Sequence, residues 1–331
     1  MSEAVVASNL RKVFRTRKGM EIRAVDGISF SLKQGELFSL LGPNGAGKTT
    51  TISMLCGLLT PTDGEALIRG VSMTRDPLEA KRHIGVVPQE IALYPRLTAR
   101  QNLQFFGRMY GLTGAELDDR VAELLEFLEL ADRGDDRIES FSGGMKRRVN
   151  IAVGLLHRPP VLFMDEPTVG VDPQSRRRIL DTIEHLKAEH GIAILYTTHL
   201  MEEAQELSDR VGIIDHGKLI AVGTQSELTA TVHQLDRVEL EVNETTVPPE
   251  FLEQAATLPG VEGVSQAAPD VESGTGIVEI LAHDGRRLLP ECGQLLLQVL
   301  VAIGKSGSTF LRSTQRLFVR RTVIAQLVRH V

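Results

Sequence analysis

The stretch LGPNGAGKTT, residues 41–50, decides the fold of this chain. It follows an apolar run, ELFSLL at 36–41, and precedes a helical pattern, TTISMLCGLL at 50–59. The eight residues from Gly42 to Thr49 match G-x-x-x-x-G-K-[ST], which forms a phosphate-binding loop when it lies between a strand and a helix. The flanking runs provide that context, so a chance glycine loop is the weaker interpretation.

Each residue type in this loop suits the phosphate chain of a nucleotide. Glycine permits positive φ and leaves backbone N–H groups free to surround an anion, and the N-terminus of the following helix adds partial positive charge. Lys48 is predicted to reach the β- and γ-phosphates of ATP, and the Thr49 hydroxyl to ligate Mg²⁺, which prefers oxygen. The predicted nucleotide contacts of the loop are Gly42, Asn44, Gly45, Gly47, Lys48, Thr49 and Thr50.

Later apolar runs predict a parallel sheet around this loop. VLFMD at 161–165, AILYTT at 193–198 and VGIIDHG at 211–217 are nearly continuously apolar, as in parallel strands that are buried on both faces. Helical patterns at 176–190 and 200–210 alternate with these strands. Strand, helix, strand, helix in sequence favours a doubly wound α/β sheet.

Two carboxylates end the first of these strands, in VLFMDEP at 161–167. A carboxylate that ends a strand beside a phosphate-binding loop is placed at the metal, so Asp165 is predicted to hold Mg²⁺ directly or through water. Glu166 follows immediately and points in a different direction, which suits it to polarise a water for attack on the γ-phosphate. Taken alone, the pair is better interpreted as an acidic surface turn before Pro167; its combination with the loop favours the metal site.

A second predicted anion site is the turn SFSGGMKRR at 140–148. Ser142, Gly143 and Gly144 precede a helical run and thus form a helix N-terminus able to meet an anion, or alternatively a simple helix cap. One active site rarely needs two such cradles from one chain. The combination therefore suggests two copies facing each other head to tail, with two ATP molecules at the interface.

Four single residues complete the predicted site. Gln89 follows an apolar strand, where a neutral amide can touch both the metal and the attacking water, and His199 ends another strand at the edge where ligands gather. Asp172 either crosses the dimer interface or starts a turn before Pro173. Phe14 either stacks on adenine or packs in the core.

Taken together and in this order, these motifs resemble the ATP-binding cassette (ABC) ATPases, from Phe14 to about Gly223. The resemblance implies that Phe14 stacks on adenine and that Gln89 heads a loop which senses a membrane subunit. It implies that Ser142, Gly143 and Gly144 close on the partner copy's ATP. By the same resemblance, Glu166 is the catalytic carboxylate, Asp172 the dimer contact and His199 the switch histidine. Gln89 and Lys48 are also assigned to catalysis, and Thr49, Gln89 and Asp165 to Mg²⁺.

One residue departs from the family pattern. The signature usually continues with Gln after the two glycines, and here Met145 takes that place. The backbone donors survive, so the resemblance still implies closure on ATP, although Met145 cannot provide the polar side chain of the usual glutamine. GLLTPTDG, TARQNL and FSGGMKRR are similar to the daunorubicin-resistance-type exporter subunits, which implies an ABC-2-type membrane permease as partner.

The chain is predicted to contain two domains. Residues 1–228 form the nucleotide-binding domain, with an antiparallel β subdomain and an inserted helical subdomain at about 90–160; residues 229–331 form a small α+β accessory domain. The chain after Glu291 has no acid but six basic residues, and three interpretations stay open: attraction to an anionic surface, a solvated end, or an unusual terminus. These six residues are Lys305, Arg312, Arg316, Arg320, Arg321 and Arg329.

Bulk properties limit the function classes. A formal net charge of −6 gives no global basic footprint, so no nucleic-acid partner is expected. No apolar run is long enough to span a bilayer, so a role in export implies docking at the cytoplasmic face of a membrane against a separate subunit. The two cysteines, Cys56 and Cys292, match no metal-ligand spacing. Two alternative functions are a soluble ABC ATPase that acts on a ribosome or DNA complex, and a nucleotide-binding regulator without turnover.

Overall fold

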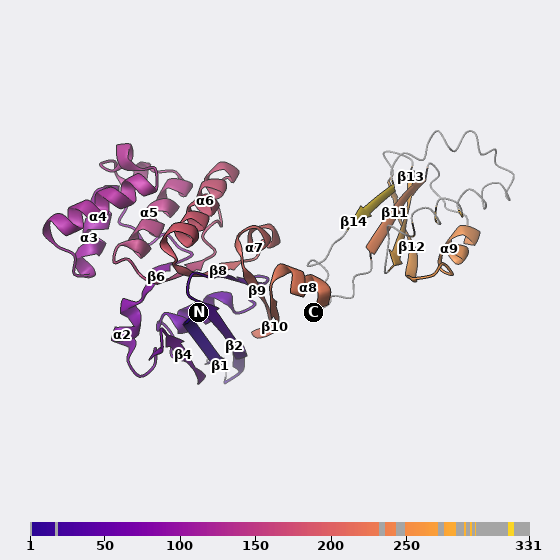
Figure 1. The fold of residues 1–331 in the computed structure, drawn as a ribbon, viewed down its shortest axis with the longest axis horizontal. Helices are drawn as coiled ribbons and strands as arrows, with labels where there is room; N and C mark the ends of the chain where they lie inside the picture. The colour runs from indigo at the N-terminus through magenta and orange to yellow at the C-terminus, as the bar shows by residue number, and fades with distance from the viewer. Residues whose placement is uncertain are drawn as a thin grey trace. The chain divides into compact units, whose positions relative to one another are not determined.

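The computed structural model describes residues 2–16, 19–231, 236–242, 249–270, 275–282, 288, 292, 295 and 317–320. The chain forms two compact units, Met1–Gln225 and Ser226–Val331. Figure 1 labels helices and strands of both units.

The first unit is built on a six-stranded sheet in the order β10-β9-β3-β8-β7-β6. β3, β6, β7, β8 and β9 run parallel, and β10 pairs antiparallel with β9 at one edge. The predicted mostly parallel sheet is therefore confirmed. The strands are β3 (Leu37–Leu41), β6 (Ile84–Val87), β7 (Val161–Asp165), β8 (Ala193–Thr198), β9 (Arg210–Asp215) and β10 (Lys218–Gly223).

Burial on both faces explains the apolar runs of the central strands. On β7, Leu162 and Met164 pack into the core that contains the helical insert, whereas Val161 and Phe163 pack into the core on the opposite face. β8 alternates in the same way. Because successive side chains point to opposite faces, a strand covered on both sides needs apolar residues throughout.

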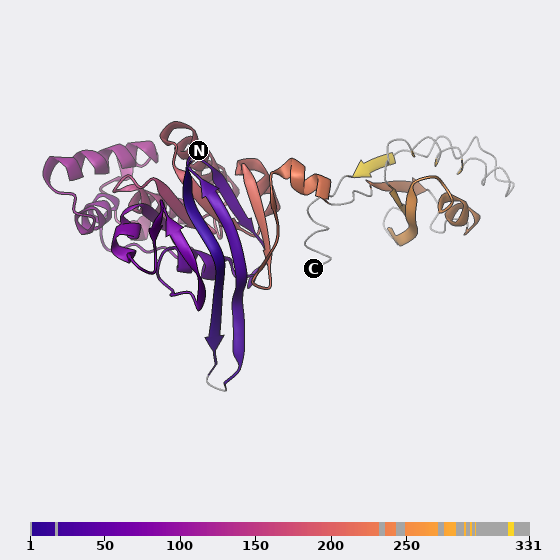
Figure 2. The same ribbon diagram turned by 60° about the horizontal axis from the view of Figure 1, so that its bottom comes forward.

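A second, four-stranded sheet has the order β2-β1-β4-β5 and is antiparallel. Its strands are β1 (Glu3–Arg15), β2 (Glu21–Lys33), β4 (Asp63–Ile68) and β5 (Val71–Ser72). β1 and β2 form the long hairpin visible in Figure 2, and both extend beyond the strands predicted from VVASNL and AVDGISFSL. The added ends, such as Arg11–Arg15, carry charged and partly exposed residues, so no buried face marks them in the sequence.

The helical insert contains α3 (Ala99–Met109), α4 (Gly114–Phe127) and α5 (Gly143–Leu155), which lie together in Figures 1 and 2. Thr98 caps α3 with a complete capping box to Gln101. Leu117, Val121, Leu124 and Leu125 of α4 recur at helical spacing and are buried, so α4 is an amphipathic helix. Two short 3₁₀ turns, η1 (Ala131–Arg133) and η2 (Ile138–Ser140), connect α4 to α5.

The remaining helices of the first unit are α1 (Lys48–Leu55), α2 (Pro77–Arg82), α6 (Pro173–His190) and α7 (Met201–Leu207). Helix α8 (Gln225–Thr231) begins at the last residue of this unit. No helix among the described residues combines the length and the apolar content that crossing a membrane requires.

The second unit has a four-stranded sheet in the order β12-β13-β11-β14 and one helix, α9 (Pro249–Ala255). The strands are β11 (Asp236–Val242), β12 (Val261–Asp270), β13 (Thr275–Ala282) and β14 (Leu317–Arg320). Phe251 of α9 packs with Val278 and Ile280 of β13 in its core. This is the small α+β arrangement predicted from the sequence. Of the six basic residues after Glu291, all but Arg320 lie outside the described residues.

Candidate nucleotide site

The glycine loop joins β3 to α1, and two of its glycines are required by close contacts. A Cβ at Gly42 would lie 2.1 Å from the carbonyl oxygen of Ile214, and one at Gly47 would lie 2.5 Å from that of Ala24. Gly47 also has φ of 107°, a conformation that L-residues with side chains rarely adopt. Within the described part of the chain, the backbone N–H groups of Gly45, Gly47 and Lys48 donate no hydrogen bond, so they are free to meet an anion.

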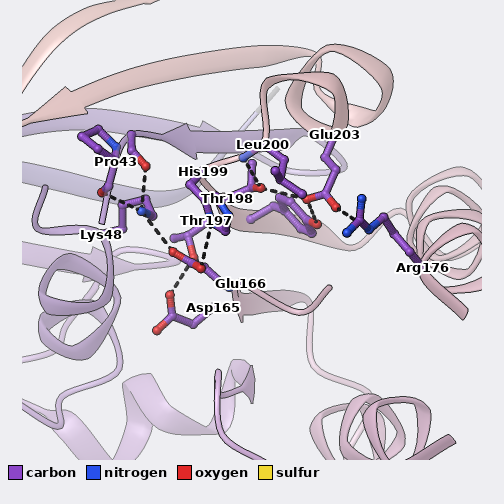
Figure 3. A network of polar contacts seen from close by, with 12 residues as sticks. Pro43, Lys48, Asp165, Glu166, Arg176, Thr197, Thr198, His199, Leu200 and Glu203 are labelled. Carbon is purple, nitrogen blue, oxygen red and sulfur yellow. Dashed lines mark hydrogen bonds and ion pairs between the residues drawn. The ribbon is translucent and has the colours of Figure 1, made fainter. Parts of the chain in front are cut away.

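Lys48 is the first residue of α1 and is 4% exposed. Its ammonium donates to the carbonyls of Gly42 and Pro43 at 2.8 and 2.9 Å, and it lies 3.0 Å from Oε1 of Glu166 (Figure 3). The loop thus wraps back over its own lysine. The cation lies between the loop and the acidic end of β7.

Asp165 and Glu166 leave β7 in different directions, as predicted. Asp165 is the last strand residue, and its Oδ1 accepts a hydrogen bond of 2.6 Å from the Thr197 hydroxyl. Glu166 has φ of 43°, in the left-handed region that is uncommon for a residue with a side chain. Such backbone strain concentrates at functional sites. Glu166 is 6% exposed, and one oxygen of its carboxylate meets Lys48.

His199 follows directly after β8 and completes this row. Its Nδ1 lies 3.1 Å from Oε2 of Glu166, the carboxylate oxygen that Lys48 leaves free. β8 lies between β3 and β7 in the sheet, and all three are parallel, so their carboxyl ends share one edge. The topology therefore brings Lys48, Glu166 and His199 into one continuous polar chain.

Sequence reasoning missed a second layer of polar residues behind this row. Thr197 supports both carboxylate residues, because its hydroxyl donates to Asp165 and accepts from the Glu166 backbone N–H at 3.0 Å. On the other side of β8, buried Glu203 of α7 accepts from the Tyr196 and Thr198 hydroxyls, each at 2.8 Å (Figure 3). Burial raises the pKa of Tyr196 well above its usual range, so the phenol stays a donor. Polar residues in an otherwise apolar strand, YTTH, were the signal available in the sequence.

Replacing Glu203 with alanine is expected to lower the free energy of unfolding by about 3 kcal/mol, because two buried hydroxyls lose their acceptor and the nearby Arg176 loses its ion-pair partner. Arg176 Nε lies 3.7 Å from Oε1 of Glu203. The neighbouring Glu202 is exposed, so Glu202→Ala should change it by no more than about 0.5 kcal/mol. Urea unfolding of both variants is the measurement; equal losses would contradict a structural role specific to Glu203.

The signature turn lies against the start of α6 in the same chain. Ser142 caps α5 and accepts a hydrogen bond from the Met145 N–H at 3.2 Å, which is the cap interpretation left open above. A Cβ at Gly144 would lie 2.2 Å from the Ser175 hydroxyl, so only glycine fits. Asp172 caps α6 through the Ser175 N–H at 2.9 Å. Among the described residues, no hydrogen bond or ion pair joins this turn to the glycine loop, so its contact with a nucleotide stays a prediction.

Two predicted residues stand apart from the row. Gln89 follows β6 by two positions and its side chain is exposed. Phe14 lies on β1, is 39% exposed and has the Lys12 ammonium 5.4 Å from its ring centroid. Phe14 is thus exposed rather than packed in the core. Asn44 and Thr49 are exposed, and Thr50 is half-buried at the start of α1.

The available oxygen donors fit a hard divalent cation better than a soft one. Thr49 offers an exposed hydroxyl, and Asp165 keeps Oδ2 without a hydrogen bond among the described residues. The described chain contains no cluster of three or more His, Cys, Asp or Glu side chains that could hold a metal by itself. A glycine loop with a buried lysine, beside a strand that ends in Asp165 and is followed by Glu166, defines a P-loop nucleoside triphosphatase.

Comparisons with known proteins place the chain more closely. The family model described as ABC transporter matches residues 25–169. The chain is 51% identical over 237 residues to the linearmycin resistance ATP-binding protein LnrL of Bacillus subtilis, covering 72% of this chain and 74% of the relative. It is 46% identical over 225 residues to the doxorubicin resistance ATP-binding protein DrrA of Mycobacterium tuberculosis, covering 68% and 67%.

The fold has solved counterparts. One is a dimeric ATP-binding cassette in a post-hydrolysis state, bound to ADP and Pi, with a TM-score of 0.61 and 28% identity over 66% of this chain and 98% of that one. The chain belongs to the ABC transporter family. It is an ATP-binding and ATP-hydrolysing subunit of the drug-resistance type.

Proposed function

We propose that the chain is the ATPase subunit of an exporter and that ATP-driven closure of two copies drives a separate ABC-2-type membrane subunit. The observation that carries this proposal is the chain Lys48–Glu166–His199, with the two outer residues 3.0 and 3.1 Å from the central carboxylate. Turnover needs such a carboxylate held beside the phosphate-binding lysine. A regulator that only binds nucleotide would not need it.

Residue roles follow from this arrangement. Lys48 and the loop N–H groups bind the phosphates, with Gly42, Asn44, Gly45, Gly47, Thr49 and Thr50 around them. Thr49, Asp165 and Gln89 would hold Mg²⁺, which supplies charge neutralisation at the phosphates. Glu166 accepts the proton of the attacking water and His199 orients Glu166 and contacts the γ-phosphate. Phe14 supports adenine by stacking.

A second copy of the chain completes each site in this proposal. Ser142 and Gly143 are exposed at the N-terminus of α5, where backbone N–H groups carry partial positive charge. The exposed carboxylate of Asp172 lies at the neighbouring start of α6. The structural relative bound to ADP and Pi is a dimer, which supports closure of two copies on the nucleotide.

Support for a membrane partner comes from exposed apolar side chains on the helical insert. Tyr94 and Phe105 are both exposed, and their rings pack edge to face with centroids 4.9 Å apart. Ile91, which lies two residues after Gln89, and Met109 are also exposed. An exposed pair of aromatic rings in contact is the kind of apolar surface that marks interaction sites.

The names of the relatives support a drug-like or lipophilic cargo. Relatives that are 51%, 46% and 46% identical carry names that mention linearmycin resistance, doxorubicin resistance and Nod factor export, respectively. In this proposal residues 1–228 are the nucleotide-binding domain, with the helical subdomain at about 90–160, and residues 229–331 are an accessory domain. The assembly lies at the cytoplasmic face of the cell membrane.

The test is to recover the full chain carrying Glu166→Gln from gently solubilised native membranes in the presence of ATP and to identify what accompanies it. We expect a stoichiometric polytopic membrane protein, because the variant should hold the closed state. Lys48→Ala, treated identically, is the matched control for capture that does not depend on ATP. Ribosomal or DNA-associated proteins, with nothing from the membrane, would instead support a soluble ABC machine.

A further inference from the structure

The segment that carries Gln89 is held by side chains of the helical insert. Arg147 of α5 donates from Nη1 to the carbonyl of Pro88 at 2.7 Å and from Nη2 to the carbonyl of Gln89 at 2.6 Å. Asn150, one turn further along α5, lies 3.4 Å from the Pro88 carbonyl and accepts from the Ala92 N–H at 3.4 Å. Residues three apart on a helix share a face, so one face of α5 holds this loop.

Arg147 has no other evident task. Arg147 is 4% exposed, and it makes no ion pair among the described residues. Its Nε has no hydrogen-bond partner. A guanidinium is costly to bury, and this one directs both of its terminal nitrogens to two successive carbonyls. The geometry fixes the peptide from which the Gln89 side chain leaves the backbone.

The same helix begins at the signature turn. Arg147 lies one helical turn after Gly143, the first residue of α5, and Gly144 packs directly against Ser175 of α6. A helix transmits displacement along its axis because its backbone hydrogen bonds keep it rigid. Movement of the Gln89 segment is therefore coupled to movement of the Ser142–Gly144 turn, and Arg147 provides the connection.

We propose that Arg147 is a positioning residue for hydrolysis, which orients Gln89 and ties its loop to the signature turn. The inference rests on the role proposed for Gln89 in the function above. Arg147 itself touches neither nucleotide nor metal in this proposal. Its contribution passes through the two carbonyls that it holds.

The adjacent Arg148 offers a matched control. It is also buried and lies on the same helix, but it donates to the Leu128 carbonyl at 2.5 Å and lies 3.7 Å from Glu129, at the end of α4. Loss of either arginine removes a buried guanidinium from α5. Only loss of Arg147 releases the Gln89 segment.

The experiment measures steady-state ATPase activity of the full chain, ATP affinity and thermal stability for Arg147→Met and Arg148→Met. We expect Arg147→Met to lower kcat about tenfold and to change the Kd for ATP by less than about twofold, as for loss of charge-assisted hydrogen bonds to a positioned group. Arg148→Met should reduce the Tm comparably and leave kcat near that of the unmodified chain. Arg147→Lys, which keeps a donor at the site, should recover part of kcat and remains informative if Arg147→Met does not fold.

A double-mutant cycle separates positioning from general stability. With Gln89→Ala already present, Arg147→Met should cause no further loss of kcat, whereas the effect of Arg148→Met should be unchanged. Equal losses in both backgrounds, or equal losses for both arginines, would overturn the inference. Gln89→Ala with normal kcat would overturn the proposed role of Gln89 and this inference together. A low kcat for Gln89→Ala beside a normal Arg147→Met would overturn only the inference.

Discussion

The variant Glu166→Gln is expected to bind ATP but to hydrolyse it about 10²- to 10⁴-fold more slowly than the unmodified chain. Glutamine keeps the size and the hydrogen-bonding reach of glutamate, so His199 retains a partner. It cannot accept the proton of the attacking water. Steady-state phosphate release and equilibrium ATP binding, measured on the same preparation, check the two halves of the prediction.

The structure adds that ATP affinity should not fall in this variant. Glu166 lies 3.0 Å from the Lys48 ammonium and competes with incoming phosphate oxygens for it. A neutral amide competes less. Since hydrolysis no longer reopens the assembly, a stable ATP-bound dimer should appear in size-exclusion chromatography. Glu202→Gln, an exposed position on α7, is the control and should turn over normally; normal turnover by Glu166→Gln would remove Glu166 from its assigned role.

The sequence predicted this row of candidate site residues because each of them lies at one end of a helix or strand. Lys48 starts the helix after a glycine loop, and Asp165, Glu166 and His199 follow apolar strands. Strand ends of a parallel sheet meet at one edge, so spacing along the chain translates directly into proximity. The structure confirms the short distances from Glu166 to Lys48 and His199.

Contacts between the middles of elements could not be predicted in the same way. Arg147 lies among basic and polar residues and resembles part of a solvated helix face, yet it is buried against carbonyls that lie 58 and 59 residues earlier. Glu203 likewise looks like one of two surface acids in MEEA. The local sequence shows where charged residues occur. Whether such a residue is buried depends on the partner that another helix or strand supplies, which the local sequence does not reveal.

The strand β1 is longer than its hydrophobic pattern predicts. Hydrophobic alternation stops before Arg11, although the strand continues to Arg15. Pairing with β2 over this part, Phe14 opposite Ile22 and Arg15 opposite Glu21, supplies the backbone hydrogen bonds without a buried face. A pattern based on burial cannot mark a strand whose end is held by its ladder alone.

The variant Lys48→Ala is expected to weaken ATP binding by about two orders of magnitude, which corresponds to about 3 kcal/mol for charge-assisted hydrogen bonds to phosphate. The same change removes the cation from buried Glu166, and an unpaired buried charge costs about 3–5 kcal/mol of stability. A loss of affinity could therefore reflect either missing phosphate contacts or a damaged fold. Calorimetric ATP binding, together with urea unfolding in the absence of nucleotide, measures the two effects separately.

The double variant Lys48→Ala with Glu166→Gln distinguishes these causes. It removes the unpaired carboxylate, so stability should return to within about 1 kcal/mol of the unmodified chain. ATP affinity should stay as low as in Lys48→Ala, because the phosphates still lack their ammonium. Lys218→Ala, an exposed position on β10, should alter neither quantity. If the double variant instead regained ATP affinity, Lys48 would act by neutralising Glu166 rather than by binding phosphate, and the glycine loop would need a different interpretation.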